Sequence, residues 1–198
     1  MKRAIFLDKD GTLIEDLPYN VDPRRIRLAP GAREAVGTWG ERGWPIAIVT
    51  NQSGVARGYF TLEELGAVER YLRSAVEDLG GTWGGFWACP HLPDGINEYA
   101  VECDCRKPAP GLIRDAAAHL GVRPEECWFV GDTWMDMAAG RAAGCRTILV
   151  GPEWRRASRY PPDAQPDHAV PDLSAAARIT VADAAEAADL AQTTEVAS

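Results

Sequence analysis

Two acidic residues, one position apart, follow the first apolar segment of the chain. Residues 5–7 (Ile-Phe-Leu) lead directly into Asp8, Lys9, Asp10 and Gly11. Two carboxylates at this spacing can share a divalent cation, or they can divide the roles of nucleophile and general acid/base. Aspartate and glycine are also common turn residues, so the stretch by itself is equally compatible with a turn after a strand. The rest of the chain must distinguish a catalytic site from a turn.

Two later apolar segments, residues 45–49 and 127–130, also end in polar clusters. If the three segments are parallel strands of one sheet, their carboxyl ends share the edge at which open α/β sheets bind ligands. Carboxylates from separate strands offer the oxygen ligands that Mg²⁺ prefers. This coincidence favours a catalytic Mg²⁺ site over ordinary turns. Residues 45–49 are followed by Thr50, Asn51 and Ser53, and residues 127–130 are followed by Asp132 and Asp136.

A cation for the same edge is available in Lys107, which follows Arg106 and precedes Pro108 and a predicted helix start. A lysine in this position is most often a surface residue. Beside three polar strand ends, however, it would complete a phosphate-binding site.

Buried apolar segments alternate with helix-compatible segments along most of the chain. This alternation predicts an α/β fold with a doubly wound parallel sheet and right-handed crossovers. Strands are expected at 4–7, 45–49, 83–88, 127–130 and 147–150, and helices at 31–42, 61–79, 110–119 and through 143, with an edge strand at 167–170 and a helix at 173–179. Residues 13–30 should form a loop or small flap over the first strand end. We expect one domain over residues 1–190 and a flexible tail at 191–198, where few large apolar residues could dock.

The composition limits the classes of function. With 198 residues and 46% hydrophobic residues, the chain can bury roughly 70% of its unfolded surface in one core. A formal net charge of -8 argues against a nucleic-acid-binding protein, which needs a basic surface. Residues 1–3 lead straight into a strand, and no apolar run approaches the roughly 20 residues of a membrane span. We therefore expect a cytoplasmic protein, monomeric and not bound to a membrane.

A second ligand set lies in the aperiodic segment 89–108, where Cys89 and His91 are followed by Cys103 and Cys105. Alternate residues of an extended segment point the same way, so each pair can offer two ligands to one ion. Three sulfurs and one imidazole form a closed tetrahedral zinc set with no open position, which indicates a structural zinc. A disulfide or a chance cluster is the alternative, but a zinc loop also explains why such a long insert lacks periodicity.

Taken in order, these features resemble the four motifs of the haloacid dehalogenase superfamily of phosphatases. The motifs are 8–12 (Asp-Lys-Asp-Gly-Thr), the strand ending in Thr50 and Asn51, Lys107, and Gly131-Asp132 with Asp136. The resemblance spans about residues 4–150, and because no large insertion follows the first or second motif, it implies that there is no large cap domain.

The resemblance also implies a role for each motif residue. Asp8 would be the nucleophile that forms an aspartyl phosphate, and Asp10 the general acid/base. Asp8, the backbone carbonyl of Asp10 and Asp132 would hold Mg²⁺. Thr50 and Lys107 would bind the phosphoryl oxygens, and Asp136 would support the metal site or Lys107.

Within this superfamily, the zinc loop and the segment 50–58 are similar to those of the D-glycero-D-manno-heptose 1,7-bisphosphate 7-phosphatases. The closely similar histidinol-phosphatases share the zinc loop. The resemblance implies a small phosphorylated sugar as substrate. One departure is Thr133, which stands where the heptose enzymes usually have a lysine that could bind a second phosphate. Substrate contacts are expected from Asp16, Tyr19, Asn51, Ser53, Arg57 and Arg106.

Three other hypotheses remain open from the sequence. The substrate could be histidinol phosphate or another sugar phosphate. The chain could be a phosphoaccepting signalling domain, which also carries an aspartate nucleophile on a doubly wound sheet, although an acid at Asp10 would hasten hydrolysis of its phosphoenzyme. It could also be a catalytically silent zinc module.

Overall fold

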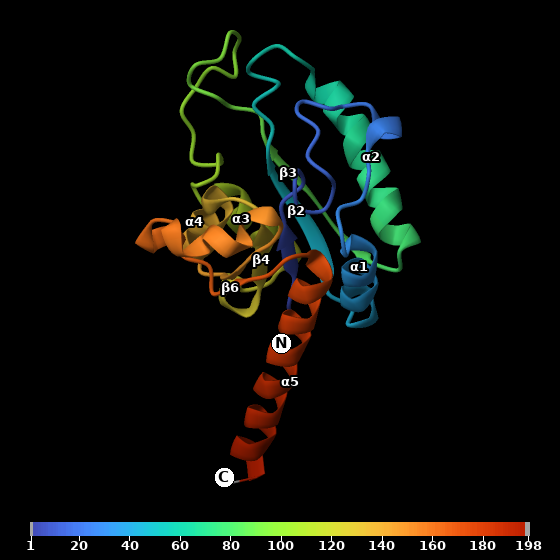
Figure 1. Cartoon of the computed structure of the whole chain (residues 1–198), viewed down its shortest axis with the longest axis vertical. Helices are drawn as coiled ribbons and strands as arrows, with labels where there is room; N and C mark the ends of the chain where they lie inside the picture. Colours follow the sequence, from blue (N-terminus) through green and yellow to red (C-terminus); the bar gives the residue numbers. More distant parts are fainter. Residues whose placement is uncertain (1, 197–198) are drawn as a thin grey trace.

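A six-stranded parallel sheet forms the centre of the molecule (Figure 1), and the computed structural model describes residues 2–196. The strand order is β3-β2-β1-β4-β5-β6. The chain therefore starts in the middle of the sheet, builds outward to β3, and returns to β1 before building the other half. The strands are β1 Ile5–Leu7, β2 Pro45–Asn51, β3 Thr82–Cys89, β4 Trp128–Gly131, β5 Arg146–Leu149 and β6 His168–Ala169.

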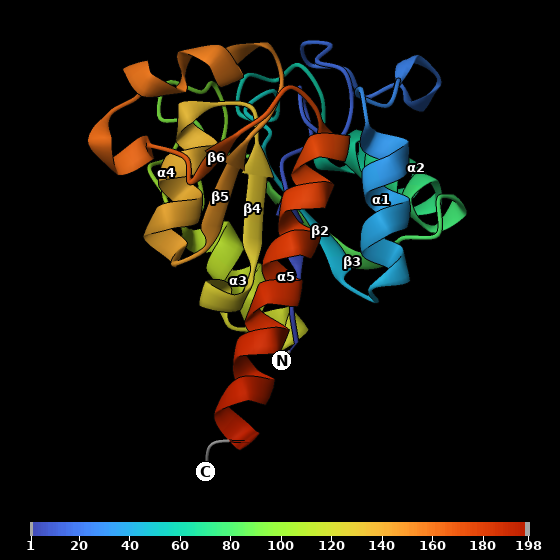
Figure 2. The ribbon, with the colours of Figure 1, turned by 60° about the horizontal axis from the view of Figure 1, so that its bottom comes forward.

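Helices cover both faces of this sheet (Figure 2), which gives three layers. Because side chains alternate along a strand, Ile5 and Leu7 face one core, together with apolar residues of α1, α2 and α5. Ala4 and Phe6 face the other core, with α3 and α4. The α-helices are α1 Ala32–Glu41, α2 Leu62–Asp78, α3 Gly111–Leu120, α4 Trp134–Ala143 and α5 Leu173–Val196, and short 3-10 helices lie at Pro23–Arg25, Pro124–Glu126, Pro152–Arg159 and Pro162–Ala164.

The starts of two helices follow from their sequences. Thr61 caps α2, and the reciprocal bonds between Thr61 and Glu64 form the capping box that its sequence predicts. Thr133 and Asp136 form the same arrangement at the start of α4. In α4 this cap also fixes the position of an acidic side chain next to the end of β4.

The predicted α/β class, parallel sheet and helix-strand alternation are confirmed. No large cap domain is present among residues 2–196, and within that range no helix has the length and apolar character of a membrane span. The main difference is α5, which runs to Val196 (Figure 1) rather than ending near Ile179. The single domain over 1–190 and the flexibility of 191–198 stay predictions, and residues 197 and 198 lie outside the described range.

The first half of α5 has partners that only the fold brings near. Trp39 of α1 is fully buried and its indole nitrogen donates to the hydroxyl of Thr180 at 2.9 Å. Asp183, on the next turn, forms ion pairs with Arg3 and Arg146, at the amino ends of β1 and β5. All three contacts join residues more than 30 positions apart, so periodicity within the helix could not reveal them.

We predict that Thr180→Val destabilises the protein by about 1–3 kcal/mol, because it leaves the buried indole N–H of Trp39 without an acceptor. Urea denaturation measures this loss. Thr180→Ser keeps the hydroxyl and serves as the control, with an expected loss of about 0.8 kcal/mol for the missing methyl group. An equal loss in both variants would show that the hydrogen bond does not anchor α5.

Candidate active site and metal-binding loop

The carboxyl ends of β1, β2 and β4 bring the first, second and fourth predicted motifs together. Asp8 directly follows β1, and its backbone N–H donates to the carbonyl of Val130 in β4 at 2.9 Å. Because β1 lies between β2 and β4, Thr50 and Asp132 flank Asp8. One cavity of about 210 Å³ has Asp8, Asp10, Thr50, Lys107, Asp132 and Asp136 in its wall.

Lys107 lies at the centre of this cavity's charged groups. Its ammonium is 2.5 Å from Asp8 and 2.6 Å from Asp136, and it donates to the carbonyl of Val49 at 3.0 Å. Lys107 and both acids are almost fully buried. The other oxygen of Asp136 accepts from the backbone and hydroxyl of Thr133. Asp136 therefore contacts Lys107 and is itself bonded to Thr133, and its supporting role stays a prediction.

Burial and mutual repulsion shape the protonation of these groups. Burial raises the pKa of Asp8 well above its usual range, Lys107 works against this rise, and the neighbouring carboxylates of Asp136 and Asp132 add to it. Burial, followed by the charge of Asp136, raises the pKa of Asp132 to about 7. Burial opposes the charged form of Lys107, but the two carboxylates outweigh it and raise its pKa. The edge therefore holds more carboxyl groups than one lysine can balance in their ionised form.

A divalent cation fits this excess of carboxylates. Oxygens of Asp8, Asp132 and Asp136 all lie within 4.8 Å of one another, and an octahedral Mg²⁺ with bonds of ~2.1 Å spans ligands about 3–4 Å apart. Lys107 pairs with both Asp8 and Asp136, and the assignment of Mg²⁺ to Asp8 and Asp132 stays a prediction. Gly11 is required beside them, because a Cβ there would lie 2.3 Å from an oxygen of Asp132.

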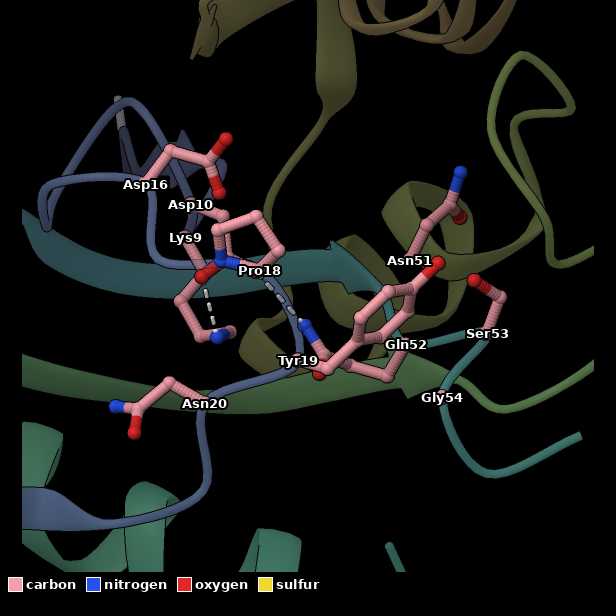
Figure 3. Close-up of a pocket in the computed structure, with 10 residues that line it drawn as sticks. All are labelled: Lys9, Asp10, Asp16, Pro18, Tyr19, Asn20, Asn51, Gln52, Ser53 and Gly54. Carbon is pink, nitrogen blue, oxygen red and sulfur yellow. Dashed lines mark hydrogen bonds and ion pairs between the residues drawn. The ribbon is translucent and has the colours of Figure 1, made fainter. Parts of the chain in front are cut away.

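Asp10 has two partners that the motif pattern did not single out. The ammonium of Lys9 is 2.6 Å from one oxygen of Asp10. The amide of Gln52 donates to the other oxygen at 3.0 Å and to the hydroxyl of Thr50 at 2.9 Å. Figure 3 shows Asp10 between these two donors. In the sequence, Lys9 lies between Asp8 and Asp10, and Gln52 lies two positions after Thr50. These positions next to motif residues are the only sequence signal that could have identified Lys9 and Gln52.

A second cavity, of about 240 Å³, adjoins the first and shares Asp10, Asp16 and Asn51 with it. Figure 3 shows its polar lining, with Tyr19 and Ser53 among the residues around it. Tyr19 has a left-handed backbone (φ 56°) and packs edge-on against Tyr59 at 4.7 Å between ring centroids. The walls offer hydrogen-bonding side chains and one aromatic ring, which suits a polyhydroxylated molecule.

The predicted substrate contacts fall into two groups. Asp16, Tyr19, Asn51 and Ser53 line the second cavity. The amide of Asn51 also exchanges two 3.0 Å hydrogen bonds with the backbone of Lys107, so it fixes the chain that delivers the lysine.

The two predicted arginines line neither cavity. Arg106 donates to the carbonyl of His91 at 3.2 Å. The Nε atom of Arg57 is buried and has no hydrogen-bond partner within the described part of the chain. Their role in substrate binding stays a prediction.

The four predicted zinc ligands converge at the end of β3. Contacts between Cys89, His91, Cys103 and Cys105 range from 3.2 to 3.7 Å. A tetrahedral zinc with Zn–S bonds of ~2.3 Å places its sulfurs about 3.7 Å apart, so the set fits zinc after a small expansion. Burial and the neighbouring thiols raise the pKa of Cys105 above its usual value, and the deprotonated cluster therefore needs a cation.

The loop between these ligands also packs on the segment that follows β2. Ile96 donates its backbone N–H to the carbonyl of Ala56 at 2.8 Å, and the side chain of Asn97 donates to the carbonyl of Val55 at 2.7 Å. Lys107 follows the last cysteine by two residues. The loop between the two cysteine pairs therefore touches both the segment after β2 and the chain that carries Lys107.

Comparison with known proteins gives consistent matches. A family model described as HAD-hydrolase-like matches residues 104–176. The D-glycero-beta-D-manno-heptose-1,7-bisphosphate 7-phosphatase of Pasteurella multocida is 39% identical over 151 residues, which are 76% of this chain and 82% of that protein. The enzyme of the same name from Pseudomonas aeruginosa is 40% identical over 150 residues, 75% of this chain and 81% of that protein.

A solved structure is similar over almost the whole chain. It is the D,D-heptose 1,7-bisphosphate phosphatase from B. bronchiseptica complexed with magnesium and phosphate. It has a TM-score of 0.78 and 32% sequence identity, and the alignment covers 92% of this chain and 99% of the other.

We predict that Lys107→Met lowers the free energy of unfolding by about 3–5 kcal/mol in metal-free buffer at pH 8, because it leaves buried carboxylates without their cation. The loss should be smaller at pH 5. The folded-state pKa of Asp8 already lies above its unfolded value. The stability that protonation of Asp8 contributes is therefore present at low pH and is lost as the pH rises through the folded-state pKa. The variant raises this pKa further, so the loss is larger at pH 8 than at pH 5.

Urea denaturation at the two pH values measures this difference. Lys2→Met, at an exposed lysine, is the matched control and should change stability little. A loss independent of pH would contradict the central role of Lys107 in balancing these acids.

Proposed function

The chain belongs to the haloacid dehalogenase-like phosphatases, and from this we propose that it removes the 7-phosphate of D-glycero-β-D-manno-heptose 1,7-bisphosphate. The reaction uses Mg²⁺ and passes through an aspartyl phosphate on Asp8. The observation that carries the proposal is the buried contact of Lys107 with Asp8 beside Asp132, at the end of a sheet like that of the heptose bisphosphate phosphatases. The β anomer follows from the names of the relatives.

In the first half of the reaction, an oxygen of Asp8 attacks phosphorus and the bond to the sugar oxygen breaks. Asp10 gives its proton to that oxygen as it leaves. Lys107 and the hydroxyl of Thr50 bind phosphoryl oxygens, where negative charge gathers in the transition state. Lys107 is poised for this because it already touches the nucleophile.

In the second half, water attacks phosphorus and the bond between phosphorus and Asp8 breaks. Asp10 now accepts the proton of the water, so it ends the cycle protonated as it began. Dividing the hydrolysis into two displacements replaces one difficult step with two easier ones. The role of Asp10 in both halves distinguishes a phosphatase from a domain that only stores a phosphoryl group.

The metal would be held by Asp8, the backbone carbonyl of Asp10 and Asp132. When bound, Mg²⁺ supplies positive charge that offsets repulsion between the attacking carboxylate and the phosphoryl oxygens. Because these carboxylates are buried and carry raised pKa values, the same charge also favours their ionised, reactive form.

The sugar would occupy the second cavity, which opens from the catalytic one through Asp10, Asp16 and Asn51. Its hydroxyl groups can bond with Asp16 and Ser53, and Tyr19 can pack against an apolar face of the ring. We assign the second phosphate to Arg57 and Arg106, because Thr133 caps α4 and offers no charge.

A second candidate substrate is histidinol phosphate. The shared wall of the two cavities carries the carboxylates of Asp10 and Asp16, and these suit a cationic imidazole or amine at least as well as a second anion. The uncharged Thr133 agrees with a substrate that has one phosphate.

The cysteine cluster would hold a structural zinc. With its four protein ligands satisfied, the ion has no open position for substrate. It would fix the two ends of the loop, and so place Arg106 and Lys107 against the cavity.

We predict that the purified protein with Mg²⁺ releases phosphate from the β anomer of heptose 1,7-bisphosphate. Its kcat/KM should exceed that for the α anomer and for histidinol phosphate by about tenfold or more, which corresponds to ~1.4 kcal/mol of discrimination. Asp8→Asn should abolish turnover on every substrate because it removes the nucleophile. Lys2→Met is the control and should retain full activity.

The same assay separates the alternatives. Preference for histidinol phosphate would replace the heptose assignment, and equal, weak activity on all compounds would contradict it. A long-lived phosphoprotein without phosphate release would identify a signalling domain. Absence of both would leave a zinc module without catalysis.

We also predict one zinc ion per chain, measurable by atomic emission, and its loss in Cys105→Ser. Turnover should then fall about tenfold or more, equivalent to ~1.4 kcal/mol in the barrier, because Lys107 is no longer fixed. Asp104→Asn alters an exposed residue between two ligands and should keep both zinc and activity. Full activity of a zinc-free Cys105→Ser protein would refute the structural role.

A further inference from the structure

Lys9 is an unusual residue to find buried. Its side chain is 2% exposed, and its ammonium contacts Asp10 at 2.6 Å. A buried ammonium is costly unless it is paired. Asp10 is the partner that the structure provides.

The use of lysine in this chain strengthens the point. The protein has only three lysines among its 21 basic residues, namely Lys2, Lys9 and Lys107. Two of the three are buried at the catalytic edge, each against one of the two acids that begin the chain's first motif. Lysine is a compact point charge on a flexible stem, which can reach a neighbouring carboxylate inside a tight turn.

Gln52 completes the arrangement from a different strand end. It is 6% exposed, and its amide donates to the second oxygen of Asp10 and to the hydroxyl of Thr50. Asp10 therefore has one donor on each oxygen, while its side chain is still 33% exposed to the cavity. Two donors at different oxygens restrict both rotations of a carboxylate that could otherwise turn freely (Figure 3).

We propose that Lys9 and Gln52 are positioning residues that hold the carboxyl group of Asp10 in line with the leaving oxygen and with the attacking water. This inference rests on the proposed phosphatase reaction. Lys9 and Gln52 touch neither phosphorus nor the leaving group, and they act through Asp10. The proton still travels from Asp10 to the sugar oxygen in the first step and from water to Asp10 in the second.

A comparison of two substrates can show whether Lys9 and Gln52 act through Asp10. A sugar oxygen needs a proton as it leaves, whereas p-nitrophenolate is a stable anion and does not. The second step is the same for both substrates and needs Asp10 to accept a proton. A misplaced Asp10 should therefore slow both steps for the sugar phosphate but only the second step for p-nitrophenyl phosphate.

The experiment compares wild type, Lys9→Met and Gln52→Leu on both compounds. For the sugar phosphate, kcat/KM should fall about 10- to 100-fold, a part of the ~10²–10⁴ that a positioned acid/base contributes. For p-nitrophenyl phosphate, kcat/KM should stay within about threefold and kcat should fall by about 10- to 100-fold. Stopped-flow measurement should then show a burst of p-nitrophenolate close to one per enzyme.

A double-mutant cycle supplies the second measurement. In an Asp10→Asn background, Lys9→Met should reduce the remaining activity by less than about threefold, because residues that act as one unit are not additive. Thermal melting checks that each variant is folded. If Lys9→Met does not fold, Gln52→Leu gives an independent test. Lys2→Met is the matched control for removal of a lysine.

The outcomes are distinguishable from failure of the proposed function. If wild type turns over neither compound, the proposed reaction itself fails. If wild type is active, an equal fall in kcat/KM on both compounds would show a purely structural role for Lys9 and Gln52. Unchanged activity, or full additivity with Asp10→Asn, would also overturn the proposal.

Discussion

The structure depends on the balance between acidic and basic side chains at a buried edge of the sheet, where an unpaired charge costs free energy. Asp8, Asp132 and Asp136 converge at one edge of the sheet, and burial and mutual repulsion act against their ionisation. Lys107 offsets part of this by contacting two of the three. The remaining excess suits a divalent cation and a phosphoryl group, which bind best where the protein has already assembled unbalanced charge.

This balance explains why a long aperiodic loop precedes Lys107. The lysine must enter from outside the sheet, across the ends of β2 and β3, and it must stay there without a helix or strand of its own. Asn51 bonds to its backbone on one side, and the cluster of cysteine ligands lies two residues before it on the other. With the proposed zinc bound, such a loop is a compact means of placing one cation, because its rigidity would come from ligands instead of a hydrophobic core.

Much of this could be predicted from the sequence because the signals are local. Short apolar segments ending in acids locate the strand ends, and the cysteine spacing locates the cluster of Cys89, His91, Cys103 and Cys105. What could not be predicted depends on contacts between distant segments. The anchoring of α5 follows from the contact of Trp39 with Thr180, and the proposed role of Gln52 follows from its contact with Asp10 across 42 positions. No pattern within one segment records such pairings.

The two cavities differ in how strongly the fold determines them. Around Asp8, almost every polar group contacts another, so a change in one residue disturbs several and the chemistry is narrowly specified. The second cavity is built from loops, with Tyr19 held by an exposed ring contact and Ser53 on a segment that the loop carrying the cysteine cluster supports. Loops tolerate substitution better than strand ends. Members of one family can therefore share the first cavity and differ in the second, and we propose that the second cavity, rather than the nucleophile, selects the substrate.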